Sequence, residues 1–193
     1  EVEPEFIPIV WEDAGEMLSS GEIDCIWGDC SAASDAKTEE LSYSEPFLQG
    51  SQVVVCLSET GIRNLADLSG QRIGARKSSC GLLALEESTA FRNSLASVSV
   101  YDSYDDAKTA LDNKKISAVV MGYAAAQYYQ NEQPDTYTVL ERENGSAEVL
   151  AEDSYCVSFL ADAEALNAKV QGVLRVMKDD GTLDTYSAKW FGA

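Results

Sequence analysis

Histidine is absent from this chain of 193 residues, and positively charged side chains are few. Without histidine the chain cannot build a His-dependent catalytic triad or a His-ligated zinc site, because the commonest general base and metal ligand is missing. Only 14 Lys and Arg oppose 33 Asp and Glu, which gives a formal net charge of −19. So acidic a chain has few cations to neutralise phosphates, which argues against nucleic acid and anionic membranes as partners.

Long hydrophobic runs are also missing, since none approaches the roughly 18–20 residues that span a bilayer. The chain opens on the acidic stretch 1–5, which does not have the basic and apolar regions of a signal peptide. Any secretion signal or anchor has therefore been removed or never existed. The composition leaves two classes open, a soluble acidic binding domain or an enzyme of unusual chemistry.

Cysteine is present five times, an odd number at irregular spacing without any CxxC pair. This pattern gives little support to a zinc knuckle or a thioredoxin-type site. We interpret the cysteines as free, mostly buried thiols, although one disulfide stays open if the chain functions outside the cell. We expect no metal and no cofactor.

Strand-like and helix-like patterns alternate along almost the whole chain. Strands are predicted at 6–10, 23–27, 52–57, 72–75, 98–101, 116–121, 137–140 and 155–160. Helices are predicted between them, including one from about 81 to 95 and an amphipathic tail that begins at Asp162. This alternation predicts an α/β fold with parallel sheets, which bind ligands beyond the carboxyl ends of their strands.

Several local signals refine this prediction. Asp13 is a candidate N-cap for a short helix that ends at Gly21. Ser103 and Asp106 resemble a capping box at the start of another helix. Trp27 ends an apolar strand, so we expect it in the core.

The segment from Arg76 to Gly81 lies between a predicted strand and a predicted helix, and it is the strongest site signal in the sequence. Backbone N–H groups and hydroxyls at a helix start suit a carboxylate or another anion. The candidate residues here are Arg76, Lys77, Ser78, Ser79 and Cys80. The alternative is that Ser78 or Ser79 simply caps the helix.

An ordered series of motifs resembles one known family. The series comprises Trp11, Leu18, Gly21-Glu22-Ile23-Asp24, Tyr43-Ser44-Glu45-Pro46-Phe47, Val53-Val54-Val55, Asp67–Gly74, Asp180-Gly181-Thr182 and Lys189-Trp190-Phe191-Gly192. Over essentially the whole chain it resembles bacterial extracellular solute-binding proteins of family 3, the amino-acid-type periplasmic binding proteins of ABC transporters.

This resemblance implies a type II periplasmic-binding-protein-like fold, in which two Rossmann-like lobes are joined by a two-segment hinge. Lobe 1 would comprise 1–50 plus 155–193, lobe 2 would comprise 51–154, and the hinge would lie near 51–57 and 154–160. The family's usual opening strand and helix have no counterpart in the sequence, so lobe 1 is predicted to be N-terminally shortened. The chain is then a truncated form, or a second chain or swapped element completes the lobe, which predicts self-association through lobe 1.

The resemblance also implies ligand contacts in lobe 1. Trp11 stands where the family stacks an aromatic ring on the ligand, although a core or rim position is the alternative. Lys37 stands where the family has a carboxylate-binding arginine, although a surface lysine is equally open. The remaining lobe 1 candidates are Ser34 and the loop residues Asp29, Cys30 and Ser31.

In lobe 2 the resemblance adds Gly122 and Tyr123 to the segment after Arg76. The family carries an aspartate at the position of Gly122, where it pairs with the ligand's α-amino group. Glycine cannot form that charge-assisted bond, and lysine does not have arginine's bidentate fork. These departures favour a ligand other than a free α-amino acid, or a site that has decayed.

The function that we predict is capture of a small polar ligand, an amino acid or related metabolite, and its presentation to an ABC-transporter membrane permease. The expected location is extracytoplasmic, in the periplasm or lipid-anchored at the cell surface of a bacterium. A sensor domain on the same fold is the first alternative. An enzyme of dehydratase type is the second, but Asp29 is the only acidic residue in the three predicted cleft loops. We therefore expect no enzyme.

Overall fold

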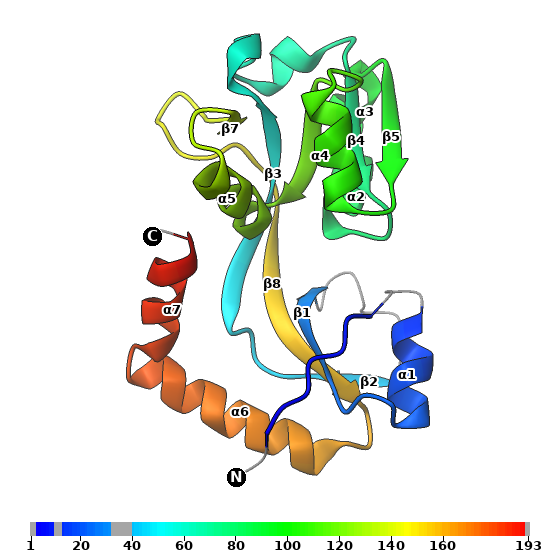
Figure 1. Cartoon of the computed structure of the whole chain (residues 1–193), viewed down its shortest axis with the longest axis vertical. Coiled ribbons are helices and arrows are strands. Elements are labelled where there is room, and N and C mark those ends of the chain that lie inside the picture. The colour runs from blue at the N-terminus through cyan, green and yellow to red at the C-terminus, as the bar shows by residue number, and fades with distance from the viewer. Residues whose placement is uncertain (1–2, 10–12, 32–39, 192–193) are drawn as a thin grey trace. The chain divides into compact units, whose positions relative to one another are not determined.

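A computed structural model describes residues 3–9, 13–31 and 40–191 of the chain (Figure 1). In chain order the elements are α1 (Ala14–Ser20), β1 (Ile26–Ser31), β2 (Leu41–Tyr43), β3 (Leu48–Leu57), the 3₁₀ turns η2 (Ser58–Thr60) and η3 (Leu65–Leu68), β4 (Arg72–Arg76), α2 (Cys80–Glu87), α3 (Thr89–Ser94), β5 (Ser97–Tyr101), α4 (Tyr104–Asp112), β6 (Ala118–Gly122), α5 (Tyr123–Glu132), β7 (Tyr137–Val139), β8 (Val149–Leu160), α6 (Glu164–Asp179) and α7 (Thr182–Phe191).

The chain divides into two compact units, and each unit is built from two stretches of sequence. Unit 1 comprises Glu1–Leu48 and Ser154–Leu183, and unit 2 comprises Gln49–Asp153 and Asp184–Ala193. The chain therefore passes between the units near the start of β3, within β8 and within α7. The lobe boundaries drawn from the sequence stay a prediction; they place everything from 155 onward in lobe 1, whereas α7 is divided between the units.

Unit 1 is organised around the second half of β8, which pairs antiparallel with β1 and with β2. Successive strand residues point to opposite faces, so β8 contributes to two separate cores. Val157 and Phe159 are fully buried against Leu174 of α6. On the other face Leu160 packs with Leu18 of α1 and with Ile26. The two helices thus cover opposite faces of one small sheet.

Unit 2 contains a mixed sheet in the order β3-β6-β4-β5, with β7 paired to β3. Strand β4 runs parallel to β5 and β6, whereas β3 runs antiparallel to β6. Alternate residues of β3 enter two cores: Val53 and Val55 pack with residues of α4, and Val54 packs with Leu85 of α2. The predicted α/β fold is confirmed, and parallel pairing is found in the β4–β5–β6 part of the sheet.

Three predictions made from local patterns are wrong. Residues 3–9 contain no strand, because Pro8 has no N–H to donate and Phe6 is 87% exposed; Val10 lies outside the described residues. The single helix predicted for 81–95 is two helices that break at Ser88, where ψ is 60°. Trp27 is 55% exposed rather than buried, and its ring rests on that of Phe47.

The predicted helix-end residues stand at the ends of helices in the structure. Gly21 adopts the left-handed conformation, with φ of 74°, and ends α1 as expected. Asp13 is the N-cap of α1, although its side chain makes no capping bond. Ser103 caps α4 by accepting a bond from the N–H of Asp106 at 3.0 Å. The carboxylate of Asp106 accepts a bond from the Ser103 hydroxyl instead of closing a full capping box.

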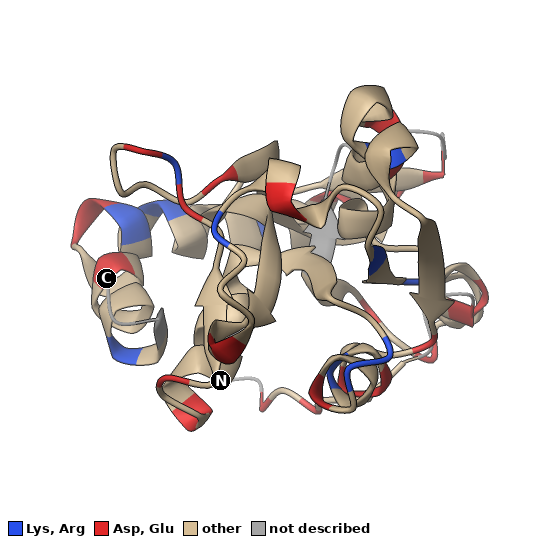
Figure 2. Ribbon diagram, turned by 90° about the horizontal axis from the view of Figure 1, so that it is seen from above, with Lys and Arg blue, Asp and Glu red and all other residues tan. Residues whose placement is uncertain are grey.

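Acidic residues occur on many elements of both units, as Figure 2 shows. The four cysteines whose side chains are described, Cys25, Cys56, Cys80 and Cys156, are free thiols, and two of them are buried. Among the described residues no cluster of His, Cys, Asp and Glu could hold a metal ion. Within the same ranges no helix has both the length and the apolar character needed to cross a bilayer.

Candidate functional site

The candidate site lies in unit 2, at the edge where the parallel strands end. Ala75 of β4 lies opposite Val120 of β6 and Val100 of β5, so all three strands finish at the same edge of the sheet. The predicted segments 76–81 and 122–123 leave the sheet there, and each leads into a helix, α2 or α5. The sheet therefore brings the lobe 2 candidates to one edge, where parallel sheets generally bind ligands.

Ser79 organises the turn between β4 and α2. It is buried, and its hydroxyl donates to the carbonyl oxygen of Arg76 at 2.7 Å while accepting from the N–H of Leu82 at 3.2 Å. Ser78 adopts a left-handed conformation with φ of 52°, which turns the chain sharply. Because the Ser79 hydroxyl caps α2, the capping role is confirmed. The positive end of the helix dipole is left at the surface of the turn.

Arg76 places a cation beside this turn. Its guanidinium carbon lies 4.9 Å from the centre of the Tyr104 ring, and the side chain is half-buried. Stacking on an aromatic face holds a guanidinium in one orientation. The next residue, Lys77, is exposed, and its N–H donates to the carbonyl oxygen of Tyr101 at 2.7 Å. The turn thus combines a helix start with two cations.

Gly122 and Tyr123 lie across the edge from this turn. Gly122 is buried and is the N-cap of α5, with φ of −62° and ψ of 141° and no side-chain capping bond. Tyr123 begins the helix and is 37% exposed. The edge therefore offers an aromatic ring at this point, and Gly122 contributes no carboxylate.

The lobe 1 candidates are placed differently from the prediction. Asp29, Cys30 and Ser31 belong to strand β1, not to a loop, and the pairing of β1 with β8 shifts register between Trp27 and Ser31. Such a shift is typical of a β-bulge. Three further candidates, Trp11, Ser34 and Lys37, lie outside the described residues.

Two buried polar residues at the unit 2 edge were missed by the sequence analysis. Gln52 is 1% exposed and Asp153 is 7% exposed, and the Gln52 side-chain nitrogen donates to an Asp153 carboxylate oxygen at 3.0 Å. Gln52 lies opposite Gly122 across β3 and β6. A glutamine at the head of a β-branched run was the available signal, because buried glutamine is rare without a partner. Tyr104, which stacks on Arg76, was missed as well.

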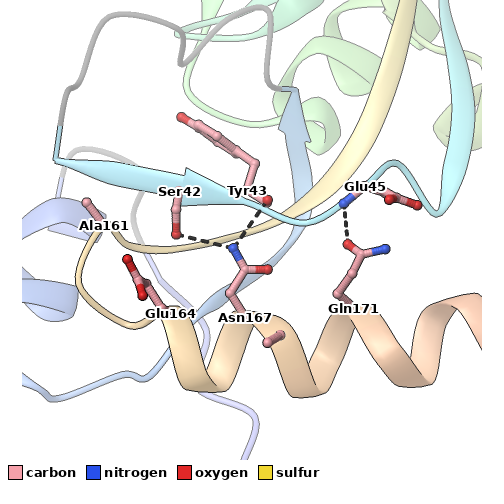
Figure 3. Close-up of a pocket in the computed structure, with 8 residues that line it drawn as sticks. Ser42, Tyr43, Glu45, Ala161, Glu164, Asn167 and Gln171 are labelled. Atoms are coloured by element: carbon pink, nitrogen blue, oxygen red, sulfur yellow. Dashed lines mark hydrogen bonds between the residues drawn. The ribbon is translucent and has the colours of Figure 1, made fainter.

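A cavity of about 490 Å³ lies in unit 1 between β2 and α6 (Figure 3). Its lining residues are Ser42, Tyr43, Glu45, Ala161, Glu164, Asn167, Ala168 and Gln171. The amide nitrogen of Asn167 donates to the hydroxyl of Ser42 and the carbonyl oxygen of Tyr43, both at 3.3 Å. Gln171 accepts from the N–H of Glu45 at 2.5 Å.

Glu45 also pairs with Arg175, which lies one turn further along α6. The hydrogen bond from the Arg175 guanidinium is the main reason why the pKa of Glu45 lies below its ordinary value. Most of the polar groups around this cavity therefore bond to one another and fasten α6 to β2. We interpret the cavity as a structural junction, and the edge of unit 2 as the candidate ligand site.

The fold, with a site at the carboxyl edge of a mixed sheet, defines the class of type II periplasmic-binding-protein-like α/β proteins. The family model for bacterial extracellular solute-binding proteins, family 3, matches residues 1–193. The chain belongs to this family, which confirms the resemblance inferred from its motifs.

Known proteins support the same assignment. The chain is 26% identical over its full length to the L-cystine-binding protein TcyJ of Escherichia coli, of which it covers 69%. It is 25% identical, over 80% of its length, to ABC transporter arginine-binding protein 1 of Escherichia coli, of which it covers 61%. A solved ABC uptake transporter substrate-binding protein from Streptococcus pneumoniae with bound histidine matches with a TM-score of 0.83 and 25% identity. That match covers 98% of this chain and 76% of the solved one.

Proposed function

We propose that this protein is an extracytoplasmic receptor that binds an amino acid or a related metabolite and presents it to the permease of an ABC transporter. Membership of the family supports the transport role. Relatives are named for binding arginine and cystine, and one similar structure contains histidine, which supports an amino acid as the ligand. The description of the family as extracellular supports a location in the periplasm or at a lipid-anchored surface.

The turn at the start of α2 is the observation that carries this proposal. A carboxylate placed there meets the positive end of the helix dipole and the guanidinium that is stacked on Tyr104. The formal charge of −19 disfavours anionic solutes at long range. We therefore propose that the ligand is a zwitterionic or cationic amino acid, whose carboxylate lies against the turn between Arg76 and Gly81.

The proposed mechanism uses the two units as lobes of a receptor that closes over its ligand. Ligand binding then shifts the open–closed equilibrium by no more than the ligand's preference for the closed form. Because Gly122 has no side chain to meet the ligand's ammonium group, the carboxylate side supplies the larger part of the affinity from unit 2. This proposal keeps an amino acid ligand and assigns the departure at Gly122 to weaker ammonium recognition.

Calorimetry with the 20 standard amino acids and L-cystine tests the proposal. We expect at least one to bind, and we expect Arg76→Met to weaken that binding about tenfold or more, as loss of a charged partner does. Arg72→Met is the matched control, because Arg72 is exposed at the opposite end of β4. If the wild-type chain binds none of these compounds, the proposed function is wrong.

We also propose that the protein acts by binding alone and leaves its ligand chemically unchanged. The named relatives are binding proteins, which supports this proposal. Mass spectrometry of the bound compound after prolonged incubation is the test, with recovery of the unaltered compound as the expected result. A dehydrated or deaminated product would contradict it and would favour the enzyme alternative.

Self-association through unit 1 forms a further part of the proposal. Phe6 is 87% exposed and Trp27 is 55% exposed, so this unit presents large apolar side chains to solvent. Sedimentation velocity of the purified chain should show a dimer that Trp27→Ser weakens. A monomer at all concentrations would rule out this part and leave the receptor role unaffected.

A further inference from the structure

We propose that Gln52, held by Asp153, is a positioning residue that fixes the ligand-binding turn at the start of α2. The inference rests on the proposed function, because it takes this turn as the place where the ligand's carboxylate lies. The two residues stand on the strands that carry the chain between the units: Gln52 lies in the middle of β3, and Asp153 is the last residue of its stretch of unit 2.

The orientation of the Gln52 amide follows from its partner. Its side-chain nitrogen donates to a side-chain oxygen of Asp153 at 3.0 Å, and the amide oxygen could not donate such a bond. The NH₂ end of the amide must therefore face Asp153, which directs the oxygen Oε1 away from it. Asp153 thus determines which end of the amide the rest of unit 2 meets.

The Oε1 atom of Gln52 faces the first turn of α2. A Cβ atom placed on Gly81 would lie 3.1 Å from Oε1 and 3.0 Å from the carbonyl oxygen of Val120. A side chain at position 81 would crowd both oxygens, so glycine suits this close approach of the helix start to the sheet and to Gln52. Since Ser79 caps the same turn two residues earlier, a shift of Gln52 displaces the capped turn that carries Arg76.

Within the described part of the chain, Oε1 has no hydrogen-bond donor, although Gln52 is 1% exposed. A buried acceptor without a donor costs stability, and a methionine of similar size would avoid that cost. Methionine would also remove the donor to Asp153, so the bond to Asp153 is what glutamine adds at this position. The amide joins the carboxylate on β8 to the binding turn on α2, and that connection is the function that we assign to it.

The test compares Gln52→Met with Gln130→Met in the full 193-residue chain. Gln130 is the matched control, because its side chain also donates one bond in unit 2, to the carbonyl oxygen of Tyr137 at 3.1 Å. With whichever of L-arginine, L-histidine and L-cystine binds the wild type most tightly, Gln52→Met should weaken affinity about tenfold. Gln130→Met should leave the affinity unchanged.

Hydrogen–deuterium exchange of the ligand-free protein provides a readout that does not depend on the ligand. Amides from Lys77 to Leu83 should exchange faster in Gln52→Met than in the wild type or in Gln130→Met. If Gln52→Met does not fold, Asp153→Asn replaces it, paired with Asp153→Leu. The asparagine retains an acceptor for Gln52 and should keep affinity and exchange close to wild type, whereas the leucine should not.

The inference is overturned if Gln52→Met and Gln130→Met change affinity and exchange equally. It is also overturned if Gln52→Met changes neither the affinity nor the exchange rates. With the substituted pair, equal behaviour of the Asp153 variants would overturn it. If no amino acid binds the wild type, the proposed function fails, and the exchange comparison alone decides whether Gln52 positions the turn.

Discussion

The hydroxyl of Ser79 donates a hydrogen bond to the backbone carbonyl of Arg76 at 2.7 Å. The same oxygen caps α2, so one side chain connects the residue that carries a cation to the helix start that carries a partial positive charge. The candidate anion site is therefore a single local unit of four residues. The two bonds of the Ser79 hydroxyl hold this unit in one conformation, which should lower the entropic cost of binding.

Ser79→Ala should weaken both the fold and the binding of the ligand. Loss of an N-cap costs about 1 kcal/mol of unfolding free energy. Ser103→Ala is the matched control, since Ser103 caps α4 in the same unit through an equivalent bond. Urea denaturation should show similar losses for the two variants, whereas calorimetry should show weaker binding for Ser79→Ala alone. Equal binding by both variants would place the ligand elsewhere.

Gly122→Asp should raise the affinity for α-amino acids, by about tenfold if the new carboxylate reaches the ammonium group. The backbone angles at Gly122 are open to any L-residue, and aspartate is a favourable N-cap for α5. Gly122→Asn separates the two effects, because asparagine caps a helix equally well but carries no charge. Calorimetry on both variants shows whether the charge or the helix cap changes the affinity. If Gly122→Asp folds and its affinity is unchanged, the ammonium group of the ligand lies away from this edge.

The thiol of Cys56 should be inert in the folded protein. Burial raises its pKa from 9.0 to about 12, and its side chain has no measurable exposure. At pH 8 the thiolate that reacts with iodoacetamide is therefore scarce and shielded. Mass spectrometry should find Cys56 unmodified in the native protein and alkylated in urea. Rapid native alkylation would contradict the burial of β3.

The same thiol predicts a dependence of stability on pH. Because its pKa is higher in the folded state, its contribution is fully present below the unfolded value near 9 and is lost as pH rises toward about 12. The unfolding free energy of the wild type should therefore fall more steeply between pH 9 and 12 than that of Cys56→Ala. Parallel pH profiles would contradict this prediction.

Much of the fold could be predicted because hydrophobic periodicity is a local property. The β-branched run after Gln52 and the 3.6-residue period of the C-terminal tail both led to correct elements, β3 and α6. The wrong predictions arise because tertiary packing, which a local pattern does not contain, decides which side chains are buried. Phe6 lies in an apolar run but forms no strand and is 87% exposed, and Trp27 lies near the start of β1 with 55% of its surface exposed.

The candidate site was predictable only in part. A strand, a polar turn and a helix start in sequence pointed to the segment after Arg76, and parallel pairing then explains why Gly122 shares its edge. The link between Gln52 and Asp153 joins residues 101 positions apart, so no local pattern could indicate it. The stacking of Arg76 on Tyr104 likewise depends on how β4 and β5 pair.

The most direct test of the central claim is an NMR titration of the ¹⁵N-labelled chain with the amino acid that calorimetry identifies. If the ligand's carboxylate lies on the α2 turn, the backbone amides from Lys77 to Leu82 should show some of the largest shifts on saturation. Amides that border the unit 1 cavity between β2 and α6 should move little. Shifts confined to that cavity, with an unchanged α2 turn, would contradict the account.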